Sequence, residues 1–226
     1  IILGGKNMNS ATIQGKITDI YKGKQVSIVT VVVKGMDRRN NVKFNYPQIL
    51  FRGNSRIFVD ECKKGDYVTV MAEVKSRQIT NKANSNKRYF DQYLNGIAIT
   101  PASNEMSEVF NTELRGPFTY KNEIYIEGSF ISAIERNNTL GVLIRPDEDD
   151  FNLYCVSYIE KDRYKELKRG TRICVRCEMQ TSIKERDGQK NFLKNLVITN
   201  FGIPGKETMS NPTTEDFRKI IRRSFL

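Results

Sequence analysis

The sequence predicts an all-β protein made of two tandem five-stranded barrels, each with a short helix between its third and fourth strands. Apolar residues alternate with a period of two through most of the 226 residues, which is the pattern of half-buried strands. The same order of strand-like and helical segments occurs twice along the chain. No apolar run approaches the roughly 20 residues needed to span a bilayer, so we expect no membrane-spanning segment and no membrane partner.

Each half has its own set of predicted elements. In the first half, strand patterns cover 11–20, 25–35, 41–53, 63–79 and 89–100, with a helix over 55–62. In the second half they cover 123–134, 139–146, 150–159, 168–184 and 191–202, with a helix over 160–167. The predicted domains are therefore 8–102 and 123–203, joined by a linker over 103–122 and followed by a linker and a C-terminal helix over 204–226.

The two halves align best at one short turn. Lys63-Lys64-Gly65 falls on Lys168-Arg169-Gly170, and further on Ile99-Thr100 falls on Ile198-Thr199. From that turn, alternate residues form one apolar face of a strand in both halves. These residues are Val68, Val70, Ala72 and Val74 in the first half, and Ile173, Val175, Cys177 and Met179 in the second.

The last segment, 213–226, has the pattern of a capped amphipathic helix. Thr213 or Thr214 begins it, acidic residues occupy its first turn and basic residues its last. Three roles remain open for this helix: packing on the barrels, self-association, or docking of a partner protein.

The composition favours a polyanionic partner. The chain has 37 Lys and Arg against 26 Asp and Glu, a net charge of +11. Residues 8–100 carry +9 and residues 101–205 carry −1, so the positive field belongs to the first half. A strongly basic domain is typical of nucleic-acid binding.

The chain has no histidine and four scattered cysteines. We expect no metal and no cofactor, because the commonest zinc ligand is absent. Cys174 and Cys177 lie three apart on a predicted strand, so they point to opposite faces, with Cys177 in the core. Unpaired cysteines and the lack of a visible signal peptide predict a reducing, cytoplasmic setting, in a bacterial or phage-infected cell.

Five strands with a helix after the third are the pattern of the oligonucleotide/oligosaccharide-binding (OB) fold. The stretch "PQILFRGNSRIFVDECKKGDYVTVMAEVKSRQI…YLNGIAITP" also resembles the second half of a bacterial-type single-stranded DNA-binding protein. The resemblance runs from Gly15 to Pro101 in the first half. In outline it extends from Gly128 to Gly202 in the second, through "KRGTRICVRCEMQTS" and "FLKNLVITN". The third strand of the second half, "LYCVSYIE", lacks the Phe-Arg-Gly turn.

The resemblance implies a protein that binds single-stranded DNA, with RNA as the alternative ligand. It implies replication or recombination proteins as partners, and a homodimer, since variants with two barrels per chain reach four barrels by dimerising. The chain departs from the family at its end. Where those proteins have an acidic tail with a terminal Phe, this chain has Arg222-Arg223-Ser224-Phe225-Leu226.

Single-strand binders combine basic residues, which meet phosphates, with aromatic residues on which bases stack. The candidates in the first half lie in the predicted 1–2 loop, the 2–3 connection, the third strand and the 4–5 loop. In that order they are Lys22, Lys24, Arg38, Arg39, Lys43, Phe44, Tyr46, Arg52, Arg77, Lys82, Lys87, Arg88, Tyr89 and Phe90. Candidates for weaker contacts in the second half are Tyr154, Tyr158, Phe192, Lys184, Arg186 and Lys190.

Two of these interpretations have structural alternatives. Phe44, Tyr46, Tyr89 and Phe90 either contact bases or belong to the barrel core, whereas Phe51 is expected in the core. The acidic run "RPDEDDF" over 145–151 either holds a metal or forms a solvated turn that repels DNA, and consecutive carboxylates cannot all converge on one ion. We favour the solvated turn.

The leading hypothesis is therefore a non-enzymatic protein that binds and protects single-stranded DNA, with little sequence preference. Its setting would be DNA replication, recombination, repair or transfer, in a phage or mobile element. The first alternative is an assembly protein or RNA-binding factor whose barrels contact other macromolecules. The second is an OB-based nuclease, which the absence of histidine disfavours.

Overall fold

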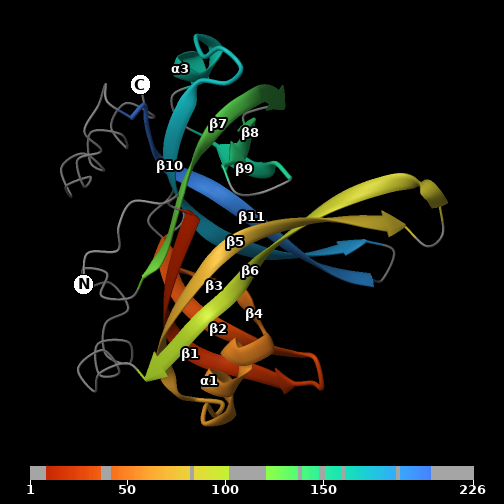
Figure 1. Cartoon of the computed structure of the whole chain (residues 1–226), viewed down its shortest axis with the longest axis vertical. Helices are drawn as coiled ribbons and strands as arrows, with labels where there is room; N and C mark the ends of the chain where they lie inside the picture. The colour runs from red at the N-terminus through yellow and green to blue at the C-terminus, as the bar shows by residue number, and fades with distance from the viewer. Residues whose placement is uncertain are drawn as a thin grey trace.

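The computed structural model describes residues 9–36, 42–81, 84–101, 121–136, 139–147, 151–158, 161–186 and 189–204 (Figure 1). Strands make up nearly all of this part of the chain. The first half contains β1 Asn9–Lys22, β2 Val26–Met36, β3 Val42–Asn45, β4 Gln48–Arg52, β5 Tyr67–Asn81 and β6 Asn84–Pro101. The second half contains β7 Asn122–Arg136, β8 Thr139–Pro146, β9 Leu153–Ser157, β10 Arg172–Arg186 and β11 Gln189–Gly202.

The strand pairings close on themselves in each half. In the first half β1 pairs with β2, β2 with β4, β4 with β6, β6 with β5, and β5 with β1. The second half follows the same order through β7, β8, β9, β11 and β10. In the first half β4 and β6 pair in parallel, and in the second half β9 and β11 do. The other pairs of each ring are antiparallel. The predicted all-β class with a closed five-stranded barrel is confirmed.

Short helical segments occur in both halves. The first half has a 3-10 turn, η1 Gly53–Arg56, followed by α1 Ile57–Asp60, and the second has α3 Lys161–Lys165. Figure 1 shows α1 and α3 at opposite ends of the molecule. None of the helices in the described residues has the length and apolar character that crossing a bilayer requires. The predicted helix over 213–226 lies outside the described residues, as does most of the linker over 103–122.

The turn that aligned the two halves has the same geometry in both. Gly65 has a φ of 100° and Gly170 a φ of 89°, values that residues with a Cβ rarely adopt. The Gly65 N–H donates to the Ile17 carbonyl at 2.9 Å, and the Gly170 N–H donates to the Phe130 carbonyl at 2.8 Å. The glycine in each turn therefore has a structural role. Its N–H connects the turn before β5 to β1 in the first half, and the turn before β10 to β7 in the second.

The two halves join through an antiparallel pairing of β1 with β7. Ala11 lies opposite Ile124, and these two residues occupy equivalent places, because Ala11 also pairs with Ala72 in β5 and Ile124 with Cys177 in β10. The joint is therefore centred on a local pseudo-two-fold axis, as in an isologous dimer interface. All eleven strands consequently form one continuous sheet.

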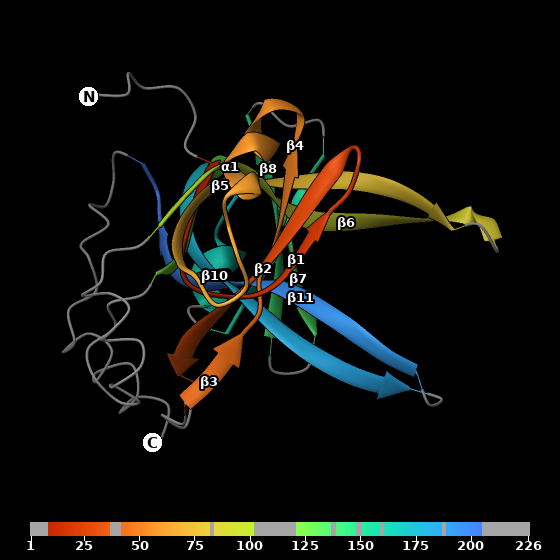
Figure 2. The ribbon, with the colours of Figure 1, turned by 90° about the horizontal axis from the view of Figure 1, so that it is seen from below.

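Two predicted elements of the first half differ in the structure. The strand predicted over 41–53 is split into β3 and β4 at Pro47, which has no N–H to donate to a ladder and whose carbonyl accepts from Val31 at 3.1 Å. The segment 80–88, predicted as a loop, belongs mostly to a long hairpin whose ladder runs as far as Asn81 opposite Asn84. Arg77 lies within β5 and therefore not in a loop. Figure 2 shows this hairpin and the β10–β11 hairpin projecting from the same side of the molecule and diverging.

The core follows the predicted alternation in both halves. All eight matched residues of the aligned fourth strands are buried, and so is Phe51, as predicted. Cys177 lies in the core beside Cys155, and burial raises the pKa of its thiol. Cys174 points away from the core as predicted but is also buried, with its Sγ 3.5 Å from the Gly202 carbonyl. All four cysteines are free thiols.

Candidate nucleic-acid interface

Each long hairpin is hydrogen-bonded to the other half of the chain. The Thr181 N–H in β10 donates to Asn45 Oδ1 at 3.1 Å, and the Tyr46 N–H donates to Thr181 Oγ1 at 2.8 Å. In the reverse direction, the Gln92 amide in β6 binds the backbone of Tyr154, with distances of 3.0 Å and 2.7 Å. Asn45 and Thr181 are buried, so losing either partner would leave an unsatisfied polar group. These bonds hold the hairpins against the opposite half.

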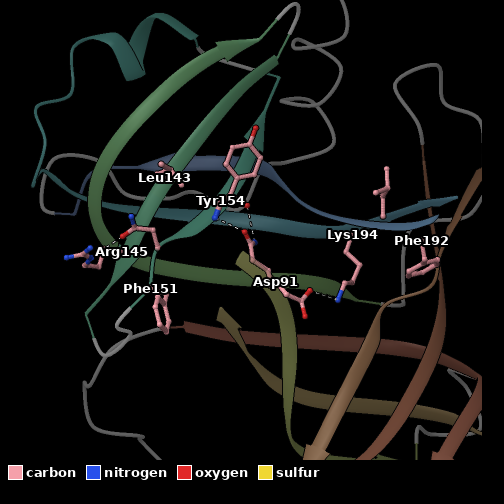
Figure 3. Close-up of a pocket in the computed structure, with 10 residues that line it drawn as sticks. Asp91, Leu143, Arg145, Phe151, Tyr154, Phe192 and Lys194 are labelled. Atoms are coloured by element: carbon pink, nitrogen blue, oxygen red, sulfur yellow. Dashed lines mark hydrogen bonds and ion pairs between the residues drawn. The ribbon is translucent and has the colours of Figure 1, made fainter. Parts of the chain in front are cut away.

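A groove of about 580 Å³ lies where the β5–β6 hairpin meets the second half (Figure 3). Its walls come from β6, β8, β9 with the segment leading into it, and β11. They combine two basic residues, one acid and several aromatic or apolar side chains. The lining residues are Asp91, Gln92, Leu143, Arg145, Phe151, Asn152, Tyr154, Phe192, Leu193 and Lys194.

A row of cations around one aromatic ring runs along the hairpin towards this groove. The guanidinium carbons of Arg52 and Arg77 lie 5.1 Å and 5.3 Å from the centre of the Tyr93 ring, within cation–π range. Arg77 donates to Asp91 Oδ2 at 2.9 Å, and Lys194 lies 3.3 Å from Asp91 Oδ1. We call these five residues the basic–aromatic row; it links the end of β4 to β11 of the other half.

The predicted residues Lys22 and Lys24 flank the row at its β4 end. Val26 pairs with Arg52, which places the 23–25 loop beside the end of β4. Arg56 fixes this loop by donating to the carbonyls of Gly23 and Lys24 at 2.7 Å and 2.6 Å. Lys22 donates to the Asp60 carbonyl at 2.7 Å, which connects it to α1, whereas the Lys24 side chain is exposed.

Phe44 and Tyr46 are surface residues of the first half. Their exposed fractions are 41% and 39%, so neither belongs to the core. Lys43, beside them, lies 3.4 Å from Gln180 Oε1. Burial raises the pKa of the nearby Glu178, while a hydrogen bond with Gln180 and the charge of Lys43 lower it. Lys43 of the first half therefore interacts with Gln180 and Glu178 of the second half.

Tyr154 differs from the other predicted aromatics. Its phenol side chain lies over Gly141 of the neighbouring strand, where a Cβ would lie 2.4 Å from the hydroxyl oxygen and 2.6 Å from the nearest ring carbon. The side chain is half-buried, and its backbone is held by Gln92. The Tyr154 ring therefore packs on the sheet at the edge of the groove.

The other predicted residues lie at or beyond the limits of the described structure. Arg38, Arg39 and Lys82 are outside the described residues. The acidic residues 148–150 of the run over 145–151 are outside them as well. Seven residues have a described backbone in β6, β10 or β11, but their side chains are outside the described part: Lys87, Arg88, Tyr89, Phe90, Lys184, Arg186 and Lys190.

Sequence reasoning did not select Arg145, Phe151 or Lys194 as site residues. Arg145 was interpreted together with the acids that follow it, and its Nε donates to Asn152 Oδ1 at 3.0 Å. Lys194 lies in an apolar strand, where a single lysine gives no signal of its own. Both reach the groove only because the β5–β6 hairpin docks there. In the described residues no group of three His, Cys, Asp or Glu is placed to hold a metal.

No protein-family model matches the chain, and no curated protein matches it by sequence. Solved structures do match. The wild-type single-stranded DNA-binding protein from Thermus aquaticus superposes with a TM-score of 0.60 at 14% identity, covering 91% of this chain and 97% of that one. A deletion mutant of that protein gives a TM-score of 0.59 at 13% identity, covering 91% and 98%. This chain therefore shares its fold with the Thermus protein over nearly its whole length.

Proposed function

We propose that this chain is a non-enzymatic single-stranded DNA-binding protein built from two tandem OB folds. The observation that supports it best is the basic–aromatic row, which leads into a groove on a fold shared with the Thermus protein. Its role would be to bind and protect single strands during replication, recombination, repair or transfer. A homodimer and replication or recombination proteins as partners belong to the same proposal.

The chemistry of the surface fits a ligand of this kind. Arg52, Arg77 and Lys194 offer donors for phosphate oxygens, which contribute affinity without reading sequence. Phe44, Tyr46 and Phe192 are exposed aromatic rings on which bases of any identity can stack. A row of cations with scattered rings suits a flexible single strand, whose bases are free to leave their own stack.

The test is titration of the protein with fluorescent oligodeoxythymidylate of about 30 nucleotides, which spans two OB folds. We expect the logarithm of the affinity to fall with the logarithm of the salt concentration, by about 0.7 for each neutralised phosphate. Duplex DNA of the same length should bind more weakly, because its bases are not available for stacking.

An oligouridylate of the same length separates DNA from RNA binding in the same assay. Equal affinity for single strands and duplex would reject the proposal. So would an affinity that does not respond to salt.

A protein-docking role is the second candidate, because α1 presents two large apolar side chains to solvent. Ile57 and Phe58 are exposed, and Tyr21 on β1 is exposed as well. An assembly protein would keep its complexes when Phe44 and Tyr46 are truncated, and lose them when Ile57 and Phe58 are.

A further inference from the structure

Asp91 holds two cations that come from different halves of the chain. Its Oδ2 accepts from Arg77 Nη2 at 2.9 Å and from Arg77 Nε at 3.2 Å, while its Oδ1 lies 3.3 Å from Lys194 Nζ. Figure 3 shows Asp91 and Lys194 pointing towards each other at the groove. One carboxylate thus occupies the position between an arginine of β5 and a lysine of β11.

A phosphodiester group has the same requirements as this carboxylate. It carries one negative charge on two terminal oxygens, and it accepts charge-assisted hydrogen bonds from the same donors. Arginine in particular matches phosphate and carboxylate with one planar set of N–H groups. Any phosphate that enters the groove beside Asp91 would meet Arg77 and Lys194 already aimed at a single anion.

We propose that Arg77 and Lys194 form a phosphate subsite for single-stranded DNA, and that the carboxylate of Asp91 fills it in the free protein. This inference rests on the function proposed above. On binding, a DNA phosphate takes the place of the carboxylate as the acceptor for both cations. Asp91 therefore lowers the affinity of the groove and keeps its cations in position.

The exposure of the three side chains makes this exchange feasible. The exposed fractions are 45% for Arg77, 25% for Asp91 and 22% for Lys194, so water and solutes can reach the pairs. Partly exposed ion pairs contribute little net stability, and an incoming anion can therefore displace them.

The exchange would leave the two halves docked. Among the contacts described above between the β5–β6 hairpin and the second half, the exchange breaks the Lys194–Asp91 ion pair. The Gln92–Tyr154 hydrogen bonds lie one residue further along β6 and remain. The Thr181–Asn45 contact of the other hairpin is also untouched.

The test is Asp91→Asn in the full chain, measured with fluorescent oligodeoxythymidylate at several salt concentrations. We expect binding about threefold to tenfold tighter than that of the wild type at low salt, because two weak ion pairs no longer compete. The dependence on salt should steepen by up to about 0.7, because the subsite neutralises one phosphate.

The matched control is Glu127→Gln, which changes the net charge by the same amount. Glu127 lies on β7 and accepts a hydrogen bond from Arg172 Nε at 2.7 Å. It does not line the groove. We expect its affinity to stay within about twofold of the wild type, since Glu127 does not line the groove and salt screens charges outside it. Equal tightening by both variants would show a general charge effect and overturn the inference.

A second variant keeps the test decisive if Asp91→Asn lowers the melting temperature. Lys194→Met should weaken binding and reduce the salt dependence by about 0.7. Unchanged affinity and salt dependence in Lys194→Met would overturn the subsite. If the wild type binds single strands and Asp91→Asn binds them no more tightly, the inference fails and the proposed function stands. If the wild type itself does not bind, both fail.

Discussion

Truncating Phe44 and Tyr46 together to alanine is expected to weaken the binding of single-stranded DNA by about 30-fold or more. Each base that loses an aromatic partner costs about 1–3 kcal/mol, so two such losses amount to at least about 2 kcal/mol. Both side chains are exposed, and the hydrogen bond of Tyr46 to Thr181 uses its backbone N–H, so the fold should be unaffected. The measurement is an oligonucleotide titration at fixed salt.

The control is Phe58→Ala, which removes an aromatic ring of the same kind from α1. Phe58 is 50% exposed but lies on the helix, away from β3. The Phe58→Ala variant should bind DNA with the affinity of the wild type. If the double variant keeps its affinity, Phe44 and Tyr46 are not stacking residues, and the ligand face must be sought at Tyr93 and Phe192.

Phe51→Ala is expected to lower the free energy of unfolding by about 3–5 kcal/mol, the usual cost of removing a buried phenyl ring. The Phe51 side chain is fully buried and is part of the core. Chemical denaturation followed by circular dichroism measures the effect. Phe58→Ala again serves as the control, and its change should stay within about 0.5 kcal/mol because the ring is exposed.

The Phe51 ring packs closely against Gly96. A Cβ built at Gly96 would lie 2.4 Å from Phe51 Cε1, which is far inside van der Waals contact with a ring that cannot move away. Gly96→Ala should therefore destabilise the protein by about 1–3 kcal/mol on its own. Combined with Phe51→Ala it should cost less than the sum, because the added methyl group enters the space that the ring has left. Strict additivity would contradict this packing.

Much of the fold was predictable because burial imposes a period on a strand. The alternation from Val68 to Val74 and from Ile173 to Met179 identified the buried faces of β5 and β10, and both are buried as expected. The Lys-Lys-Gly turn was predictable for a local reason as well. A positive φ restricts the residue type wherever the turn occurs, so the same glycine appears in both halves.

Register was less predictable, because sequence similarity over two residues does not determine which residues pair across a hairpin. Ile99-Thr100 was aligned with Ile198-Thr199, but Ile99 pairs with Val70 while Ile198 pairs with Cys177. The residue opposite Val175 is Phe201, so the structural equivalent of Ile99 lies three positions further on. That alignment was wrong, since hydrogen bonding between strands sets the register and similar side chains do not.

The sequence by itself determined the class of fold, the internal repeat, the buried strand faces and the basic character of the first half. Each of these depends on residues that are close together in the chain or on composition. Only the tertiary structure decided which cations meet. Arg77 and Lys194 are more than a hundred positions apart in the sequence, and they share Asp91 because a hairpin from one half docks on the other. Contacts of this kind depend on docking geometry, which leaves no periodic signal in a single sequence.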